Sequence, residues 1–410
     1  MWNINDSIEY LNENKDIENE ELVNVVFCKT EKENLLSVTV HHFLIDLISW
    51  EVLVKDFKAA VEQLKNGEEI SLTQKTASFK LWSEVQREYA ETITEETKEY
   101  WGNINKVLDN TRPLNTQAEV NKAERYRIAF DEDKTRMLFD EANKTYSTRT
   151  NEILLVALGI AVTKLTNTDA GIMVESHGRT ELHKSISIER TVGWFTSCFP
   201  VVIKNNNNIV KELINTKETM RRIPKNGIEY LLLNESFHKN TDVIFNFYQN
   251  TLAEEQTRNE IVSFKSETSL FKNKISVDCT VVDNVLAVHI AVLEGKHKAN
   301  ITEELGLEFK KQIEKLIEIC TETTAVTKTL SDFTDDGLTT SELQELKAWN
   351  ENVEDVYRLT PSQEGVYAQY FQSNDTKTYQ LQNVVRIGKE TSLEKLEKRV
   401  ELLSVRHVAL

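Results

Sequence analysis

The first part of the chain alternates apolar and polar residues in a way that predicts a β-hairpin. Residues 22–27 are rich in strand-forming side chains and residues 36–40 alternate in polarity, with the charged run 31–34 between them as a turn. The next segment predicts an amphipathic helix, because apolar residues recur there every three or four positions. The apolar face of this helix comprises Trp50, Leu53, Val54, Phe57, Val61 and Leu64.

Helix and strand patterns follow one another through the middle of the chain. Residues 76–106 form a polar helical stretch, and residues 131–145 carry another helical pattern. The most apolar helix is expected at 150–166 and an amphipathic one at 302–322. Strands are expected at 125–130, 171–175, 199–203, 242–247, 275–281 and 285–292. This mixture predicts the α/β (α+β) fold class.

Composition limits the classes of protein that this chain belongs to. Its 410 residues, 40% of them hydrophobic, exceed what one ordinary core needs, so two or more lobes are expected. The net charge is −17, and the 49 basic residues are interspersed among 66 acidic ones. A nucleic-acid groove or an anionic membrane surface would need a basic patch, so we expect neither partner.

The cysteines and the apolar segments bear on the cellular compartment. Cys28, Cys198, Cys279 and Cys320 form no CxxC pair and show no zinc-ligand spacing, which is typical of small apolar residues in a reducing compartment. The first residues lack the pattern of a signal peptide, and no apolar run is long enough to span a bilayer. We therefore expect a cytoplasmic protein.

Two adjacent histidines, His41 and His42, follow the second predicted strand. A strand end places at least one imidazole in a loop, where it can take and return a proton near neutral pH. A surface pair or a metal-binding pair is the alternative interpretation. The spacing to Asp46 resembles the HHxxxD signature of the condensation-domain superfamily of non-ribosomal peptide synthetases. The Ser49-Trp50 ending of this segment is similar to the epimerization branch of that superfamily.

Five further segments resemble motifs of the same branch and follow in the same order. Residues 151–155 (NEILL) resemble a helix start of the (N/D)(D/E)xLL type, and residues 175–179 (ESHGR) resemble EGHGR. Residues 190–196 (RTVGWFT) match a motif of that sequence, residues 223–228 resemble the start of IPxxGxGYG, and residues 245–247 (FNF) resemble FNY. Ordered matches over this distance are more specific than any single one.

The end of the chain resembles the start of a second condensation domain. Residues 356–366 contain LTPSQEG, which is similar to the LTPxQEG motif, and residues 406–410 resemble an RHxxLR motif cut short. We therefore expect a fragment at both ends. The resemblance implies two chloramphenicol-acetyltransferase-like lobes in a V shape. The expected parts are a partial N-terminal lobe at 1–115, a C-terminal lobe at 116–335, a linker at 336–355 and the beginning of a second condensation-like domain at 356–410.

The resemblance also implies a reaction and its partners. An epimerization domain inverts the Cα of an aminoacyl or peptidyl thioester carried on the phosphopantetheine arm of a carrier protein. One group removes the α-proton and another delivers a proton to the opposite face, and His42 and Glu175 match the family positions for this pair. Without the motif, Glu175 is equally well an ordinary strand-end carboxylate. The implied partners are an upstream peptidyl carrier protein domain and a downstream condensation domain, and no metal or directly bound cofactor is expected.

Five residues are expected to support this pair. By family resemblance, Asp46 forms a salt bridge with Arg190 that keeps the histidine loop in shape. His41 is expected to be a packed, hydrogen-bonded neighbour of the base. Asn246 is expected to bind the substrate or orient the site, and His177 either does the same or is structural.

Several positions depart from the family pattern. Leu47 and Ser176 stand where glycines are usual, Glu229 and Leu231 replace two glycines of IPxxGxGYG, and Phe247 replaces the tyrosine of FNY. These departures predict either a lowered activity or a divergent branch. Two alternatives to an epimerase therefore stay open, a peptide-bond-forming condensation domain and an inactive scaffold or docking domain.

Overall fold

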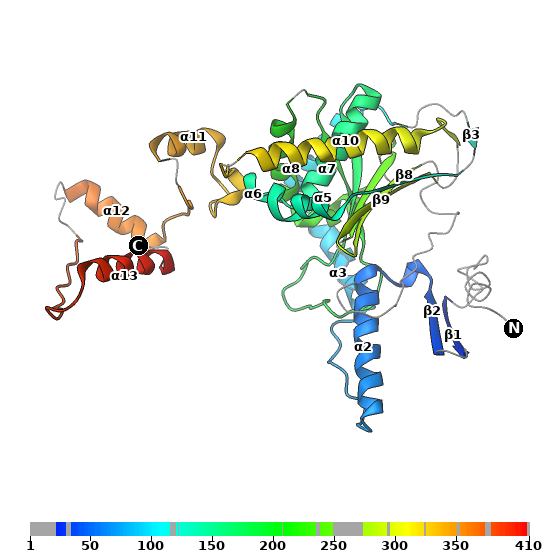
Figure 1. Cartoon of the computed structure of the whole chain (residues 1–410), viewed down its shortest axis with the longest axis horizontal. Helices are drawn as coiled ribbons and strands as arrows, with labels where there is room; N and C mark the ends of the chain where they lie inside the picture. The colour runs from blue at the N-terminus through cyan, green and yellow to red at the C-terminus, as the bar shows by residue number, and fades with distance from the viewer. Residues whose placement is uncertain are drawn as a thin grey trace. The chain divides into compact units, whose positions relative to one another are not determined.

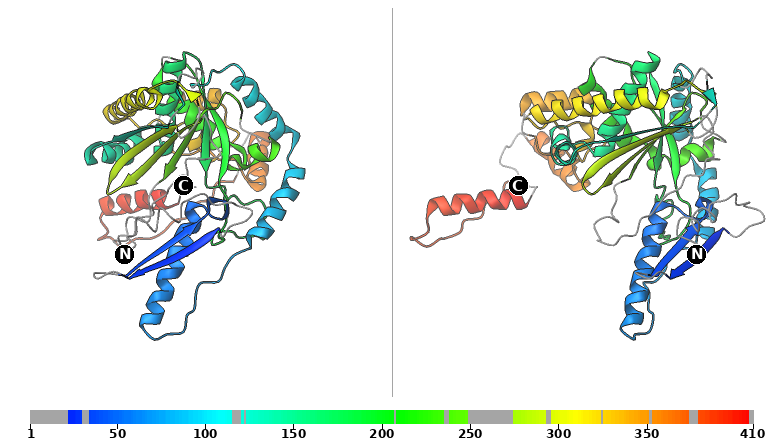
Figure 2. Two further views of the ribbon diagram at one scale, coloured as in Figure 1. Left: turned by 90° about the vertical axis from the view of Figure 1, so that its right-hand side faces the viewer. Right: turned by 45° about the vertical axis from the view of Figure 1, so that its right-hand side comes forward.

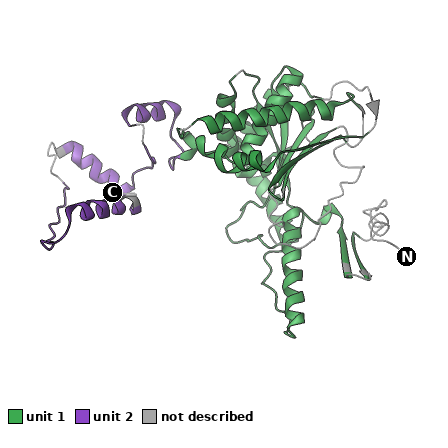
Figure 3. Cartoon of the chain, viewed as in Figure 1, with its two compact units in different colours: residues 1–332 green, residues 333–410 purple. Residues whose placement is uncertain are grey.

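The computed structural model describes most of the chain (Figure 1). The described residues are 22–29, 34–114, 120–121, 123–206, 208–234, 238–248, 274–292, 296–323, 325–350, 353–373 and 379–407. Most of the predicted turn at 31–34 and the last three residues of the RHxxLR-like segment lie outside them. The chain divides into two compact units, residues 1–332 and residues 333–410 (Figure 3). The predicted boundaries at 115, 335 and 355 stay predictions.

The described part of the first unit starts with the predicted hairpin. The strands β1 (Val23–Lys29) and β2 (Asn34–Val40) pair antiparallel in a two-stranded sheet. A 3₁₀ turn, η1 (His42–Leu44), leads into the long helix α2 (Leu47–Lys65), which confirms the helical pattern seen there. The helical stretch expected at 76–106 is two helices, α3 (Phe79–Thr92) and α4 (Glu95–Leu108). The second begins where the side chain of Thr94 caps it, accepting a hydrogen bond from the backbone N–H of Thr97 at 3.3 Å.

A six-stranded mixed sheet forms the centre of the first unit, in the order β4-β9-β8-β7-β5-β6 (Figure 2). Strand β7 runs parallel to both β5 and β8, and the other neighbours in this sheet are antiparallel. Its strands are β4 (Glu124–Ala129), β5 (Ala170–Ser176), β6 (Ser197–Ile203), β7 (Val243–Tyr248), β8 (Ile275–Val282) and β9 (Val285–Val292). The predicted α/β class is thus confirmed. A separate short pair joins β3 (Val120–Asn121) to β10 (Lys296–His297).

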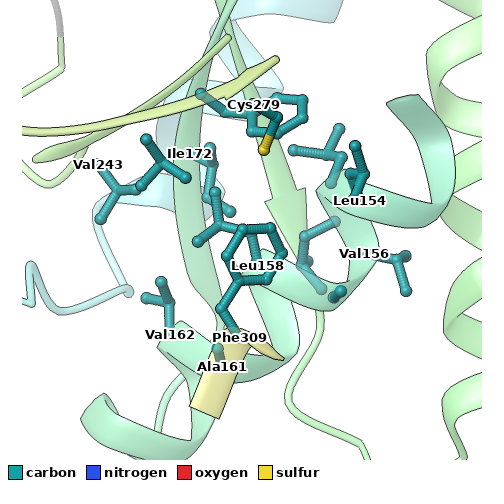
Figure 4. Packing of buried hydrophobic residues seen from close by; sticks show 14 of the residues in the cluster. Leu154, Val156, Leu158, Ala161, Val162, Ile172, Val243, Cys279 and Phe309 are labelled. Carbon is teal, nitrogen blue, oxygen red and sulfur yellow. The ribbon is translucent and has the colours of Figure 1, made fainter. Parts of the chain in front are cut away.

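Helices pack on one face of this sheet and form the main core with it. The apolar helix α7 (Thr150–Thr166) lies beside α10 (Ile301–Glu322). Leu158 and Phe309 from these helices meet Ile172, Val243 and Cys279 from the strands (Figure 4). The remaining helical segments of the unit are α5 (Glu132–Arg136), η2 (Met137–Ala142), α6 (Asn143–Thr145), α8 (Ile209–Arg222), η3 (Pro224–Gly227), α9 (Ile228–Leu233) and η4 (Leu330–Asp332).

The opposite face of the sheet carries a row of polar side chains. Side chains alternate between the two faces of a strand, and residues paired across neighbouring strands share a face. The pairing therefore aligns one residue from each strand, from β6 across to β4, on the face away from α7 and α10. The row is Cys198, Glu175, Asn246, Asp278, His289 and Arg127. It runs from exposed residues on β4 and β9 to a buried one on β7.

The second unit contains α11 (Thr340–Trp349), α12 (Pro361–Ser373) and α13 (Leu393–Arg406). The LTPSQEG segment starts α12 with a local device. Thr360 Oγ1 accepts from the backbone N–H of Gln363 at 3.3 Å, and Gln363 Oε1 accepts from the backbone N–H of Thr360 at 2.8 Å. This is a capping box, with Pro361 at the first helical position. Among the described residues, no helix is long and apolar enough to cross a membrane.

Candidate active site

His41 stabilises the start of the histidine loop. It stands between β2 and η1, and its backbone N–H donates to the carbonyl of Leu22 at 2.8 Å. Its ring Nδ1 accepts from the backbone N–H of Phe43 at 3.1 Å and thereby caps η1. Both contacts hold the backbone of the loop, in keeping with the expected role of His41 as a hydrogen-bonded neighbour of His42.

His42 is exposed, and its hydrogen bonding fixes which ring nitrogen carries the proton. Nδ1 lies 2.7 Å from the carbonyl oxygen of Ile45, and a carbonyl can only accept. Nδ1 therefore carries the hydrogen, and in the neutral ring the lone pair is on Nε2. The ring centroid lies 6.0 Å from that of Trp194. His42 thus presents a basic nitrogen beside the 190–196 segment.

Asp46 is the buried centre of contacts below this loop. The residue is 5% exposed, and its Oδ1 accepts from the backbone N–H of Ser49 at 2.7 Å, which caps α2. Its Oδ2 accepts from the backbone N–H of Phe195 at 3.2 Å. The guanidinium of Arg179 completes the set, with Nη2 at 3.1 Å from Oδ1. One carboxylate therefore joins the histidine loop, α2 and two distant segments.

The expected salt bridge between Asp46 and Arg190 is wrong. Arg190 instead pairs with Asp56, further along α2, in a partly exposed contact. Arg179 takes the place beside Asp46 because its Nη1 also donates to the carbonyls of Ile188 and Thr191, at 2.7 and 2.9 Å. The partner of Asp46 is thus Arg179, the arginine of the ESHGR segment. The motif match included this residue but predicted no role for it.

Ser49 is a second residue whose part the sequence did not show. It is completely buried, and its hydroxyl donates to the carbonyl of Gly193 at 2.9 Å. The same oxygen accepts from the backbone N–H of Gly193 at 3.0 Å and from Arg179 Nη2 at 2.9 Å. Ser49 therefore attaches α2 to the RTVGWFT segment.

Glu175 and Asn246 lie together at the ends of β5 and β7. The Nδ2 group of Asn246 donates to Glu175 Oε2 and also contacts the hydroxyl of Tyr248. Asn246 is 8% exposed and Glu175 is half-buried. Burial, followed by the nearby charge of Glu175, raises the pKa of the Cys198 thiol and of the Tyr248 phenol. Asn246 is thus placed to orient the carboxylate, as one of its two expected roles requires.

His177 lies between the two groups of residues. Burial and the charge of Arg179 lower its pKa, against a smaller opposing effect of Asp46. Its Nδ1 accepts from the backbone N–H of Arg179 at 3.0 Å. The lowered pKa favours a neutral ring near pH 7. His177 therefore stabilises the turn between the strand end at Glu175 and Arg179.

The two candidate acid–base residues lie near the stretch of chain that leads into β6. The ring of His42 lies beside Trp194, while Glu175 pairs across the sheet with Cys198, four residues later. Four residues of extended chain span at most about 14 Å, which limits the distance between the backbones of Trp194 and Cys198. That His42 and Glu175 face one another across a channel stays a prediction.

The departures from the family pattern have separate structural surroundings. Leu47 is the first residue of α2, and Glu229 is buried and accepts from the hydroxyl of Tyr89. Leu231 lies on α9, and Ser176 pairs with a serine at the start of β6. Phe247 points to the helix-covered side of the sheet, where its ring centroid lies 6.2 Å from that of Phe139. The missing tyrosine hydroxyl at this position would therefore not point toward Glu175.

The mixed sheet, its helices and the histidine loop define a chloramphenicol-acetyltransferase-like α/β protein. The family model for the condensation domain matches residues 3–339. The chain therefore belongs to the condensation-domain family, as its motifs indicated.

Relatives of this chain are peptide synthetases. Bacitracin synthase 2 of Bacillus licheniformis is 34% identical over 351 residues, which cover 80% of this chain and 13% of that protein. Gramicidin S synthase 1 of Brevibacillus brevis is 29% identical over 360 residues, or 79% of this chain and 32% of that protein. The chain thus spans less than a third of the length of either relative.

A solved structure of similar fold is the epimerization domain from the third module of tyrocidine synthetase B. It is 25% identical in sequence, with a TM-score of 0.61 over 75% of this chain and 74% of that one. Among the described residues, no cluster of three or more histidine, cysteine, aspartate or glutamate side chains is arranged to hold a metal ion.

Proposed function

We propose that this chain epimerizes the Cα of an aminoacyl or peptidyl thioester carried by a peptidyl carrier protein. The observations that carry the proposal are a histidine beside Trp194 whose Nε2 holds a lone pair, and a carboxylate that is held by Asn246 and pairs across the sheet with Cys198. The similarity to a solved epimerization domain supports this reaction over others of the family.

The residues divide the reaction into two proton transfers. Nε2 of His42 takes the α-proton, and the electron pair of the broken C–H bond passes into the thioester carbonyl to give an enolate. The protonated carboxyl of Glu175 then gives its proton to the opposite face of Cα, and the electron pair returns from the oxygen. The histidine loses its proton and the carboxylate regains one by exchange with solvent. In the reverse direction the two residues exchange roles.

Each group near the pair has a part in this scheme. The hydrogen bond from Asn246 holds the carboxylate of Glu175 in place. The bond from Nδ1 of His42 to Ile45 leaves the lone pair on Nε2. The buried Asp46–Arg179 pair holds the loop that bears this histidine and does not itself touch the reacting atoms.

The test is α-proton exchange in deuterium oxide. The chain is incubated with a carrier protein bearing L-aminoacyl-phosphopantetheine thioesters, and deuterium at Cα is measured beside chiral analysis of the released amino acid. We expect deuterium uptake and a mixture of D and L forms, because protonation from two faces approaches an equilibrium. His42→Ala should slow uptake by about 10²–10⁴-fold. Glu175→Gln keeps the shape of the side chain, and we expect it to impair protonation from one face.

The same assay separates the alternatives. A second, acceptor-loaded carrier protein is included, so that peptide-bond formation is measured in parallel. A peptide bond formed without deuterium uptake would favour a condensation domain, which the family model also allows. Neither product, from a chain whose melting curve shows a folded protein, would favour a scaffold or docking domain.

A further inference from the structure

Tyr248 lies on the same face of β7 as Asn246. Residues two apart on a strand point to the same side of the sheet, so Tyr248 follows Asn246 on the polar face. Phe247, between them, points to the other side and packs near Phe139. The single phenol hydroxyl at the end of this strand thus belongs to residue 248, one position later than in the FNY pattern.

Asn246 connects Tyr248 to the carboxylate. An amide NH₂ group has two hydrogens, and Nδ2 of Asn246 contacts both Glu175 Oε2 and the Tyr248 hydroxyl. Asn246 is 8% exposed, so its hydrogen bonds are made away from bulk solvent. Fixing one hydrogen on Tyr248 restricts rotation of the amide, which fixes the direction of the other hydrogen toward Glu175.

The surroundings keep the Tyr248 phenol neutral. Its pKa is raised well above the ordinary value by burial and then by the charges of Glu175 and Asp278. The titratable groups whose charges act on Tyr248 come from three neighbouring strands: Glu175 on β5, Cys198 on β6 and Asp278 on β8. A neutral hydroxyl accepts from Asn246 without placing a third negative charge beside the two carboxylates.

We infer that Tyr248 is a positioning residue of the candidate active site, which acts through Asn246 to hold the carboxylate of Glu175 at the end of β5. The inference deepens the proposed function, because Glu175 is one of the two proposed acid–base groups. The FNY pattern ends one residue before Tyr248 and predicts no polar role for it. The Tyr248 hydroxyl nevertheless contacts Nδ2 of Asn246.

The experiment compares Tyr248→Phe with the matched variant Phe247→Tyr in the full chain. The first removes one hydroxyl from the polar face, and the second adds one on the side toward Phe139. The titration of Glu175 is followed by carbon NMR of ¹³C-glutamate-labelled protein, with Glu175→Gln assigning the resonance. Deuterium uptake at Cα is measured against pH in parallel, and melting temperatures verify that the variants fold.

We expect Tyr248→Phe to raise the pKa of Glu175 by about half a unit to one unit, the effect of loosening one hydrogen bond to a carboxylate. The pH profile of exchange should move in the same direction. Phe247→Tyr should leave the Glu175 titration as in the wild type. An unchanged Glu175 titration in Tyr248→Phe, or an equal change in Phe247→Tyr, would overturn the inference.

The two readouts separate this inference from the proposed function. The titration of Glu175 needs no substrate, so a shift in Tyr248→Phe supports the positioning role even if the wild type exchanges no α-proton. In that case the proposed reaction fails and the positioning role stands. If the wild type exchanges the α-proton but the pH profile of Tyr248→Phe is unaltered, the proposed reaction stands and the positioning role fails.

Discussion

Replacing Arg179 with alanine tests the largest difference between the sequence motif and the structure. The variant leaves the Asp46 carboxylate, whose side chain is 6% exposed, without its cation. It also removes the hydrogen bonds to the carbonyls of Ile188 and Thr191. Removing one partner of a buried ion pair typically costs about 3–5 kcal/mol. Because whole domains are stable by about 5–15 kcal/mol, Arg179→Ala should lose a large part of the total.

The matched control is Arg190→Ala, which removes the arginine that the motif had suggested. Arg190 and Asp56 have side chains 26% and 30% exposed, so their ion pair is partly solvated. Such pairs contribute about 0–1 kcal/mol. The control should therefore change the free energy of unfolding several times less than Arg179→Ala does.

Urea unfolding followed by tryptophan fluorescence measures both variants. Trp82 and Trp101 are almost completely buried in the first unit, so their emission reports its unfolding. With a urea slope of about 3 kcal/mol per molar, the midpoint of Arg179→Ala should fall by about 1–2 M. The midpoint of Arg190→Ala should fall by less than about 0.4 M. If Arg190→Ala lowers the midpoint as much as Arg179→Ala, the assignment of Arg179 as the partner of Asp46 is refuted.

Two further predictions concern stability. Asp332→Ala should destabilise the first unit by about 3–5 kcal/mol, because it leaves the fully buried Lys217 without this carboxylate. Burial opposes ionisation of Asp332, but the hydrogen bond from Lys217 holds its pKa below the ordinary value. Its contribution should therefore be complete above pH ~4 and lost as the pH falls through the folded-state pKa, so thermal melts of wild type and variant should converge in acid. Gly178→Ala should cost more than about 1 kcal/mol in urea unfolding, because φ is +62° and the new Cβ would lie 1.6 Å from the carbonyl oxygen of Phe195. Gly67→Ala, at φ +72° with nothing within 4 Å, is the control that isolates this contact, and equal losses in the two variants would contradict the expected clash.

Local features of the site followed from the sequence because they depend on neighbouring residues. The helix pattern after the histidine loop identified α2, and Asp46 stands at its N-cap with its acceptor oxygen three residues before Ser49. The capping box at Thr360 is contained in four residues of the LTPSQEG motif. The strand pattern at 171–175 also located Glu175 near a strand end.

Contacts between distant segments were decided by the tertiary structure. The sheet order brings β5 beside β7, although α8 and α9 separate them in the chain, and this places Asn246 on Glu175. The arginine beside Asp46 could not be chosen from the sequence, since Arg179 and Arg190 both lie in matched motifs. The backbone carbonyls of Ile188 and Thr191, which fold around the Arg179 guanidinium, made that choice.

The amino-acid sequence by itself determined the family, the class of fold and the segments that carry the candidate chemistry, because motifs and hydrophobic periodicity are properties of neighbouring residues. The direction of each side chain depended on strand register and on which face the helices cover. Phe247 shows the difference, since the sequence marks it as a lost hydroxyl while the pleat of β7 turns it toward Phe139. The same pleat brings the hydroxyl of Tyr248 to Asn246, because long-range packing fixes the register that a linear motif leaves open.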